Sequence, residues 1–156
     1  MSLIAFNNWL SSTPLSLLIQ RTSGAIAGIQ VIHILCLATL FALALNLSLR
    51  TAGRGLSAEP LASLAARFVP ALWICLGVLL LSGALLIIAE PHRTLGNPIF
   101  YTKMGLLVAA VALTVWLAAL ARRQSEERTA LRAGVAALYM LIWTGIIVAG
   151  RFIAYH

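Results

Sequence analysis

Three chemically capable side chains lie at three-residue intervals inside a long apolar segment. The segment runs from Gly24 to Phe41 and reads GAIAGIQVIHILCLATLF, and the three residues are Gln30, His33 and Cys36. In a helix this spacing places all three on one face. A histidine inside hydrocarbon must find a partner or a ligand, because it has lost its contact with water. The pattern marks His33 as the first candidate for chemistry.

The chemistry open to His33 depends on what can approach it. Neutral imidazole is the commonest metal ligand, and haem is often held by a histidine inside a helix bundle. Gly24 and Gly28 form a small-xxx-small pair close to the same face, where another helix or a flat macrocycle can approach the backbone. The residues alone leave three interpretations open: an axial ligand of haem b, a neutral histidine that hydrogen-bonds a neighbouring helix, and a proton-relay or quinone contact.

Three cations at the ends of apolar runs are candidates for binding the carboxylates of a cofactor. They are Lys103 in NPIFYTKMGLL, Arg151 in IIVAGRFIAYH, and Arg21. Arginine binds carboxylates through two parallel hydrogen bonds, so such a set could hold the two propionates of haem. The alternative is that these cations extend to the membrane surface as anchors, with Phe100 and Tyr101 in the aromatic belt.

A second histidine, His92, lies in the segment AEPHRTLGNP. It is the candidate second axial ligand of a haem in the outer half of the membrane. It also follows Pro91 in an expected turn, where a solvated loop histidine is the simpler interpretation. The candidate metal ligands are therefore His33 and His92.

Residue types exclude several other sites. The chain has no aspartate, which rules out a Ser–His–Asp triad. Cys36 and Cys75 do not form a Cys-x-x-Cys-His motif, so a covalent c-type haem is excluded, and each is expected to be a small buried side chain. Copper is weakly supported, because Met104 is the methionine near the polar level. No catalytic residue can be assigned.

The elements that carry these residues follow from the composition. The 156 residues are 62% hydrophobic and 10% charged, whereas about a quarter of a soluble domain is charged. A spanning helix needs roughly 20 apolar residues, and four runs qualify, at about 23–49, 68–89, 99–121 and 131–152. Thr13 as N-cap and Pro14 predict a further helix over about 13–21, in the membrane interface. The predicted fold class is all-α, with residues 1–156 as one domain: a four-helix transmembrane bundle with a short N-terminal interfacial helix.

Local signals predict the helix ends. Asn97 as N-cap and Pro98 predict the start of the third span. Pro70 is expected near the start of the second span, where its missing N–H does no harm. Ser125, followed by two glutamates, predicts the start of the fourth. The small residues from Gly145 to Gly150 predict close packing against another helix.

The charges between the spans predict the orientation. The first and third connections carry seven lysines and arginines, and the opposite side carries four. The positive-inside rule then places both long connections in the cytoplasm and both termini in the periplasm of a bacterial inner membrane. The basic residues do not form one patch, so we expect no nucleic-acid partner. The expected partners are the lipid bilayer and a protein in the membrane or periplasm.

Four segments resemble a known group of proteins. They are HIL in the first span, RFVPALW and LLLSGALL in the second, and NPIFYTKMGLL at the start of the third. Over roughly residues 9 to 123 the chain resembles uncharacterised small four-helix bacterial membrane proteins, which are similar to copper-resistance-D-like proteins and to membrane-type haem-containing protoporphyrinogen oxidases. In those oxidases a histidine of the first span and a lysine opening a later span are functional, and His33 and Lys103 match them. The first span ends here in ALNLSLR, without the basic motif and extra histidine of the oxidases.

The residues and the resemblance together favour an integral membrane b-type haem-binding protein. His33 is the expected axial ligand, with Gln30 and Gly28 beside the cofactor, and the expected task is electron transfer between the membrane and a periplasmic partner. Two alternatives stay open: a cofactor-free structural subunit of a membrane complex, and a membrane oxidase that acts on a porphyrinogen or a quinone.

Overall fold

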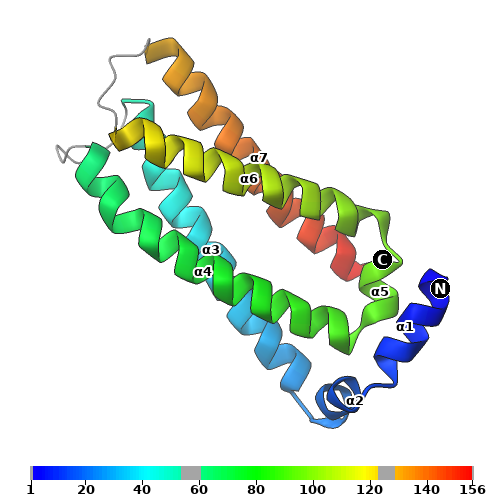
Figure 1. Cartoon of the computed structure of the whole chain (residues 1–156). Coiled ribbons are helices and arrows are strands. Elements are labelled where there is room, and N and C mark those ends of the chain that lie inside the picture. Colours follow the sequence, from blue (N-terminus) through cyan, green and yellow to red (C-terminus); the bar gives the residue numbers. More distant parts are fainter. Residues whose placement is uncertain (1, 54–60, 123–128, 156) are drawn as a thin grey trace.

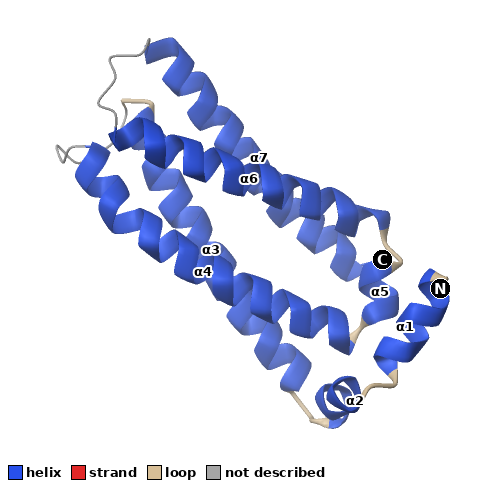
Figure 2. Cartoon of the chain, viewed as in Figure 1, coloured by secondary structure: helices blue, strands red, loops and turns tan. Residues whose placement is uncertain are grey.

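The computed structural model describes residues 2–53, 61–122 and 129–155. These residues form helices and no strand is found among them (Figures 1 and 2). The helices are α1 (Leu3–Ser11), α2 (Pro14–Arg21), α3 (Ala25–Thr51), α4 (Leu61–Ala89), α5 (Pro91–Leu95), α6 (Pro98–Arg122) and α7 (Thr129–Tyr155). Helices α3, α4, α6 and α7 are long and apolar enough to cross a membrane. The predicted all-α, four-helix transmembrane fold is confirmed, and short helices precede the first span.

The four spanning helices pack in the cyclic order α3, α4, α6, α7. Helix α3 contacts α4 and α7, and α6 contacts α7 and α4. The short helices α1, α2 and α5 gather at one end of the bundle, near the start of α3 and the end of α7 (Figure 1). We call this end the α5 end.

The buried core is concentrated away from the α5 end on helix α3. The buried residues of α3 all fall between Leu40 and Thr51, and none falls between Ala25 and Thr39. Around them packs an apolar cluster that includes Tyr139 and Trp143. Both cysteines are free and pack against this cluster as partly buried side chains, so each is less buried than predicted. The half of α3 that carries His33 is therefore largely uncovered by the rest of the chain.

Helix α2 closes the end of α4. The backbone N–H of Ser16 lies 3.4 Å from the Thr13 hydroxyl, which confirms Thr13 as the N-cap. The Ser16 hydroxyl donates to the carbonyl of Ile88 at 2.7 Å, and the Gln20 amide donates to the carbonyl of Ala89 at 3.0 Å. The last carbonyls of a helix have no partner within it, so these bonds hold α2 on the end of α4. Helix α1, which lies before Thr13, was not predicted.

The second span begins earlier than predicted. Helix α4 starts at Leu61, so Pro70 lies inside the helix rather than near its start. The residues before Pro70 include two leucines and three alanines, which favour helix. A proline is tolerated inside a membrane helix because neighbouring helices satisfy the freed backbone groups. The predicted start of the third span is confirmed, because the Asn97 side-chain oxygen accepts from the N–H of Ile99 at 2.9 Å. The start predicted at Ser125 lies outside the described residues.

The small residues of α7 pack against α6 of the same chain. A Cβ atom built on Gly145 would lie 3.2 Å from the Cδ1 atom of Leu106. One built on Gly150 would lie 3.3 Å from the Nζ atom of Lys103. The predicted close helix packing is confirmed, and the other helix belongs to the same molecule.

Candidate functional site

His33 is joined to α4 by a hydrogen bond to Ser82. The Nδ1 atom of His33 lies 2.9 Å from the Ser82 hydroxyl. That hydroxyl also lies 2.7 Å from the carbonyl oxygen of Val78, one turn earlier on α4. A carbonyl can only accept, so the single hydroxyl hydrogen of Ser82 goes to Val78. The Ser82 oxygen therefore accepts from Nδ1–H of His33, and the Nε2 atom of the neutral ring keeps a free lone pair.

The His33 ring lies against the backbone of α4. A Cβ atom built on Gly83 would sit 3.4 Å from the Cε1 atom of His33 and 3.9 Å from Nδ1. The glycine therefore leaves the imidazole just enough room beside the helix. The ring of this half-buried residue meets α4 through the Ser82 hydroxyl and the backbone carbonyl of Leu79. These contacts hold the ring in place on the α4 side, and with Nδ1 protonated the lone pair of Nε2 is the one available to a ligand.

Lys103 on α6 is a cation that acts electrostatically on His33. Its Nζ atom lies over the backbone of Gly150, and it lies within electrostatic range of the His33 ring. Glu90 does not neutralise it, because the Glu90 carboxylate pairs with Arg93 at 2.8 Å. Within the ranges that the structure describes, no carboxylate pairs with Lys103. The site thus combines an imidazole with a positive charge that an acidic group of a ligand could balance.

The remaining residues predicted for the site lie at different distances from it. Gln30 is half-buried one helical turn before His33, and a Cβ atom on Gly28 would meet nothing within 4 Å. Arg151 is exposed and directly follows the glycine that Lys103 covers. Arg21 is exposed at the end of α2, and no described contact joins it to Lys103.

The role of Gly24 is to let the backbone adopt a left-handed conformation at the start of α3, and not to provide a packing surface on that helix. It has a φ of +79° at the start of that helix, a conformation that favours glycine. The glycine pair at Gly24 and Gly28 is therefore not a helix-packing contact within the described chain. The close-approach glycine of this site is Gly83 on α4.

The structure does not bring His92 to His33. His92 lies on α5, is exposed, and lines a shallow groove of about 410 Å³ with Arg93 and the residues 96–99. Ser82, the partner of His33, lies seven residues before the end of α4, which corresponds to about 10 Å along the helix. In this arrangement His92 is an exposed surface residue at the α5 end.

Sequence reasoning did not assign a role to Ser82 or Gly83. Both lie in the segment LLLSGALL. The signal was present, because Ser82 is the hydroxyl residue of the apolar run 68–89 and a glycine follows it. What the sequence could not give is the pairing of that serine with a histidine 49 positions earlier.

The donor set fits haem better than a metal ion bound by the protein alone. A protein-only zinc site uses three or four side-chain ligands, and no group of three His, Cys, Asp or Glu side chains gathers in the residues that the structure describes. Haem iron needs only one or two ligands from the protein, because the porphyrin nitrogens supply the others.

Comparison with protein-family models, with curated proteins and with solved structures found no match to this chain. Its function must therefore be inferred from the chemistry of the site.

Proposed function

We propose that this protein is an integral membrane b-type haem-binding protein, with the Nε2 atom of His33 as an axial ligand. The observation that carries the proposal is the hydrogen bond from Nδ1 of His33 to Ser82. Metal-binding histidines donate their second ring nitrogen to a neighbouring group, which fixes the tautomer and the ring orientation. Ser82 fulfils that requirement here because its own hydrogen is given to Val78.

The surroundings of His33 leave room for a large flat group. The half of α3 from Ala25 to Thr39 has no buried residue, and Gly28 faces open space on the helix. Gln30 lies beside this open surface. In the proposal the cofactor lies against this half of α3, and lipid or a partner protein covers its other side.

Charge supports the same placement. Haem carries two propionates, which are stable in a membrane protein only where cations or water reach them. Lys103 lies within electrostatic range of His33, and Arg151 directly follows Gly150, the residue of α7 beside which the Lys103 Nζ atom lies. Arg21 can contribute to the same charge balance only if the end of α2 turns toward Lys103 and Arg151. The proposal assigns no second ligand from His92, because His92 lies exposed on α5, away from His33.

The proposed task is one-electron transfer between the membrane and a periplasmic protein. Bound haem supplies the redox couple, and the chain supplies the ligand, its orientation and the charge balance. The seven-to-four bias of lysine and arginine favours an orientation with the α5 end on the periplasmic side of a bacterial inner membrane. A cofactor near that end would lie close to a periplasmic electron-transfer partner.

A second candidate function is a cofactor-free structural subunit of a membrane complex. The observation in its favour is the same bond, because a His33–Ser82 contact also joins α3 to α4. Hydrogen bonds between membrane helices average only about 0.6 kcal/mol. In that function the free Nε2 atom and the unpaired charge of Lys103 have no use. An oxidase acting on a porphyrinogen or a quinone is the third alternative, and it requires turnover.

The visible spectrum of the purified protein separates these functions. The protein is expressed in haem-replete cells, purified in mild detergent, and scanned first oxidised and then reduced with dithionite. A b-type haem gives a Soret band and reduced α and β bands, with about one haem per chain. Protein that is pure, folded and colourless would leave the structural subunit as the function. Turnover of a porphyrinogen by the coloured protein would identify the oxidase.

A further inference from the structure

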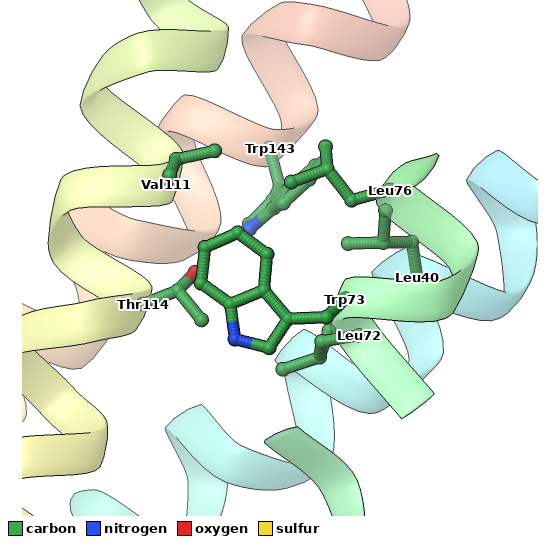
Figure 3. A pocket seen from close by; sticks show the side chains of 7 residues that line it. All are labelled: Leu40, Leu72, Trp73, Leu76, Val111, Thr114 and Trp143. Atoms are coloured by element: carbon green, nitrogen blue, oxygen red, sulfur yellow. The ribbon is translucent and has the colours of Figure 1, made fainter. Parts of the chain in front are cut away.

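A small cavity between the spanning helices is lined almost wholly by apolar side chains (Figure 3). It measures about 10 Å³, and the polar groups beside it are paired with one another. The Thr114 hydroxyl donates to the carbonyl of Ala110 at 2.8 Å. The Tyr139 hydroxyl bonds both Thr114 and the Trp143 indole. Because these groups are satisfied, the surface that still lacks a role lies outside the bundle, on the short helices α1 and α2.

Helix α1 exposes its large apolar side chains and buries a polar one. Its buried residue is Asn7, which is 4% exposed. Leu3, Ile4, Phe6 and Trp9 are exposed instead, Ile4 by 70% and Trp9 by 57%. A surface helix in water shows the opposite pattern, with its apolar side turned toward the protein. The reversed pattern indicates that α1 lies in apolar surroundings.

Helix α2 continues this apolar surface. Leu15 and Leu18 are exposed and lie about one turn apart, while Ser16 and Ile19 are buried against the protein. The sequence carries no charged side chain between Ser2 and Gln20. Placing this surface in hydrocarbon therefore removes no charge from water.

The position of the two helices identifies these apolar surroundings as the membrane surface. Figure 1 shows α1 and α2 lying across the end of the bundle, crosswise to the spanning helices. Helix α4 has 29 residues, so it is about 43 Å long, which matches the thickness of a bilayer with its headgroups. Ser16 and Gln20 hold α2 on the last carbonyls of α4, and α1 packs on α5 and α4. Both helices therefore lie where the hydrocarbon meets the headgroups.

Aromatic side chains are present at the same depth. The rings of Phe6 and Trp9 lie 5.7 Å apart on α1. Tyr101, in the first turns of α6, is also exposed at this end of the bundle. Tryptophan and tyrosine are enriched at membrane–water interfaces. Asn8 is exposed and lies nearly opposite Phe6 on the helix, where a polar side chain can meet headgroups and water.

We propose that α1 and α2 form an in-plane anchor that binds the lipid leaflet at the α5 end of the bundle. Phe6 and Trp9 lie among the upper groups of the acyl chains, and Asn8 lies on the headgroup side. Because its lipid-facing surface is apolar and uncharged, the anchor binds through buried apolar area and needs no anionic lipid. That surface contains none of the residues assigned to haem, so the anchor does not depend on the proposed function.

Spin labels on α1 of the full-length protein test the anchor. With Cys36 and Cys75 replaced by alanine, a nitroxide is attached at Phe6→Cys and, as the matched control, at Asn8→Cys. Each protein is studied in phosphatidylcholine nanodiscs, where oxygen concentrates in the hydrocarbon and a nickel chelate stays in water. We expect the label at Phe6→Cys to be relaxed mainly by oxygen and the label at Asn8→Cys mainly by the nickel chelate. Adding phosphatidylglycerol should change neither result.

Three outcomes of this experiment overturn the proposal. A label at Phe6→Cys that is relaxed mainly by the nickel chelate places that side of α1 in water. Low accessibility to both reagents shows that a protein partner or a second copy of the chain covers the surface instead of lipid. Oxygen accessibility that appears only with phosphatidylglycerol shows that the anchor requires anionic lipid.

Tryptophan emission gives a second readout that leaves the anchor intact. The emission of the wild type minus that of Trp9→Phe isolates the signal of Trp9. We expect this difference to be quenched by phosphatidylcholine brominated near the top of its acyl chains, and less by lipid brominated near the chain ends. A difference that neither lipid quenches contradicts the insertion of Trp9 into the leaflet.

Discussion

The imidazole of His33 and the hydroxyl of Ser82 join the first two spanning helices through a 2.9 Å hydrogen bond. The direction of this bond is set on α4, where Ser82 gives its only hydrogen to the carbonyl of Val78. His33 must then donate from Nδ1, which leaves Nε2 without a proton. The same contact therefore connects two helices and prepares a metal-ligating nitrogen.

Removing the Ser82 hydroxyl should weaken haem binding more than it weakens the fold. Loss of the group that orients a ligating histidine costs about 10- to 100-fold in metal affinity. Loss of a hydrogen bond between membrane helices costs only about 0.6 kcal/mol. We therefore expect Ser82→Ala to lose haem to apomyoglobin at least tenfold faster than wild type, with thermal unfolding almost unchanged.

Thr39→Val is the matched control for Ser82→Ala. The exposed Thr39 hydroxyl bonds only the carbonyl of Leu35 in its own helix. This variant should retain haem like the wild type. Equal haem loss in wild type and Ser82→Ala would show that Ser82 does not orient the ligand.

Lys103→Met should lower haem retention and lower the reduction potential. Removing one partner of a fully buried ion pair costs about 3–5 kcal/mol, and less at a half-buried position such as this one. A positive charge near the iron favours the reduced state, so its loss moves the potential downward. Redox titration of the purified variants measures the change, and Lys103→Arg should restore most of it. If the reduction potential and the haem retention of Lys103→Met equal those of the wild type, Lys103 does not bind the cofactor and serves only as a membrane anchor.

Gly145→Leu should destabilise the contact between α6 and α7. Even a Cβ atom at this position would lie 3.2 Å from Leu106, and overpacking a helix contact costs about 1–3 kcal/mol. We expect a lower midpoint of thermal unfolding in detergent. Gly134→Leu on the same helix is the control, because a Cβ atom there meets nothing within 4 Å. Equal stability of the two variants would contradict the packing of this glycine on α6.

Cysteine labelling should place the two ends of the bundle on opposite sides of the membrane. With Cys36 and Cys75 replaced by alanine, Ser2→Cys is expected to react with an impermeant maleimide added to intact cells. Arg54→Cys should react only after the inner membrane is permeabilised, because the positive-inside rule places its connection in the cytoplasm. The reverse pattern would invert the proposed orientation.

The sequence was sufficient for the fold because hydrophobic length and capping residues act locally. Four largely apolar runs of roughly 20 residues have the length of membrane-spanning helices, and Thr13 and Asn97 cap the helices that they were predicted to cap. Pro70 misled the prediction, because a proline in the first turn and one inside a helix look alike in sequence. Helix neighbours inside the bundle decide whether the longer helix forms.

Only part of the site could be predicted, because the other part depends on contacts between helices and not on local sequence. His33 and Lys103 stand out because charge and imidazole are costly in hydrocarbon. Ser82 and Gly83 matter through a contact between two helices, and no local pattern reveals which faces of those helices meet.

The most direct test of the haem proposal is the visible spectrum of His33→Gln beside that of the wild type and of His92→Gln. Glutamine keeps a hydrogen-bonding side chain in the membrane and gives up strong iron ligation. The proposal predicts a Soret band in the wild type that is lost or converted to a high-spin form in His33→Gln, whereas His92→Gln keeps its haem. A wild-type protein without a Soret band would contradict haem binding, and an unaltered spectrum in His33→Gln would remove His33 as the ligand.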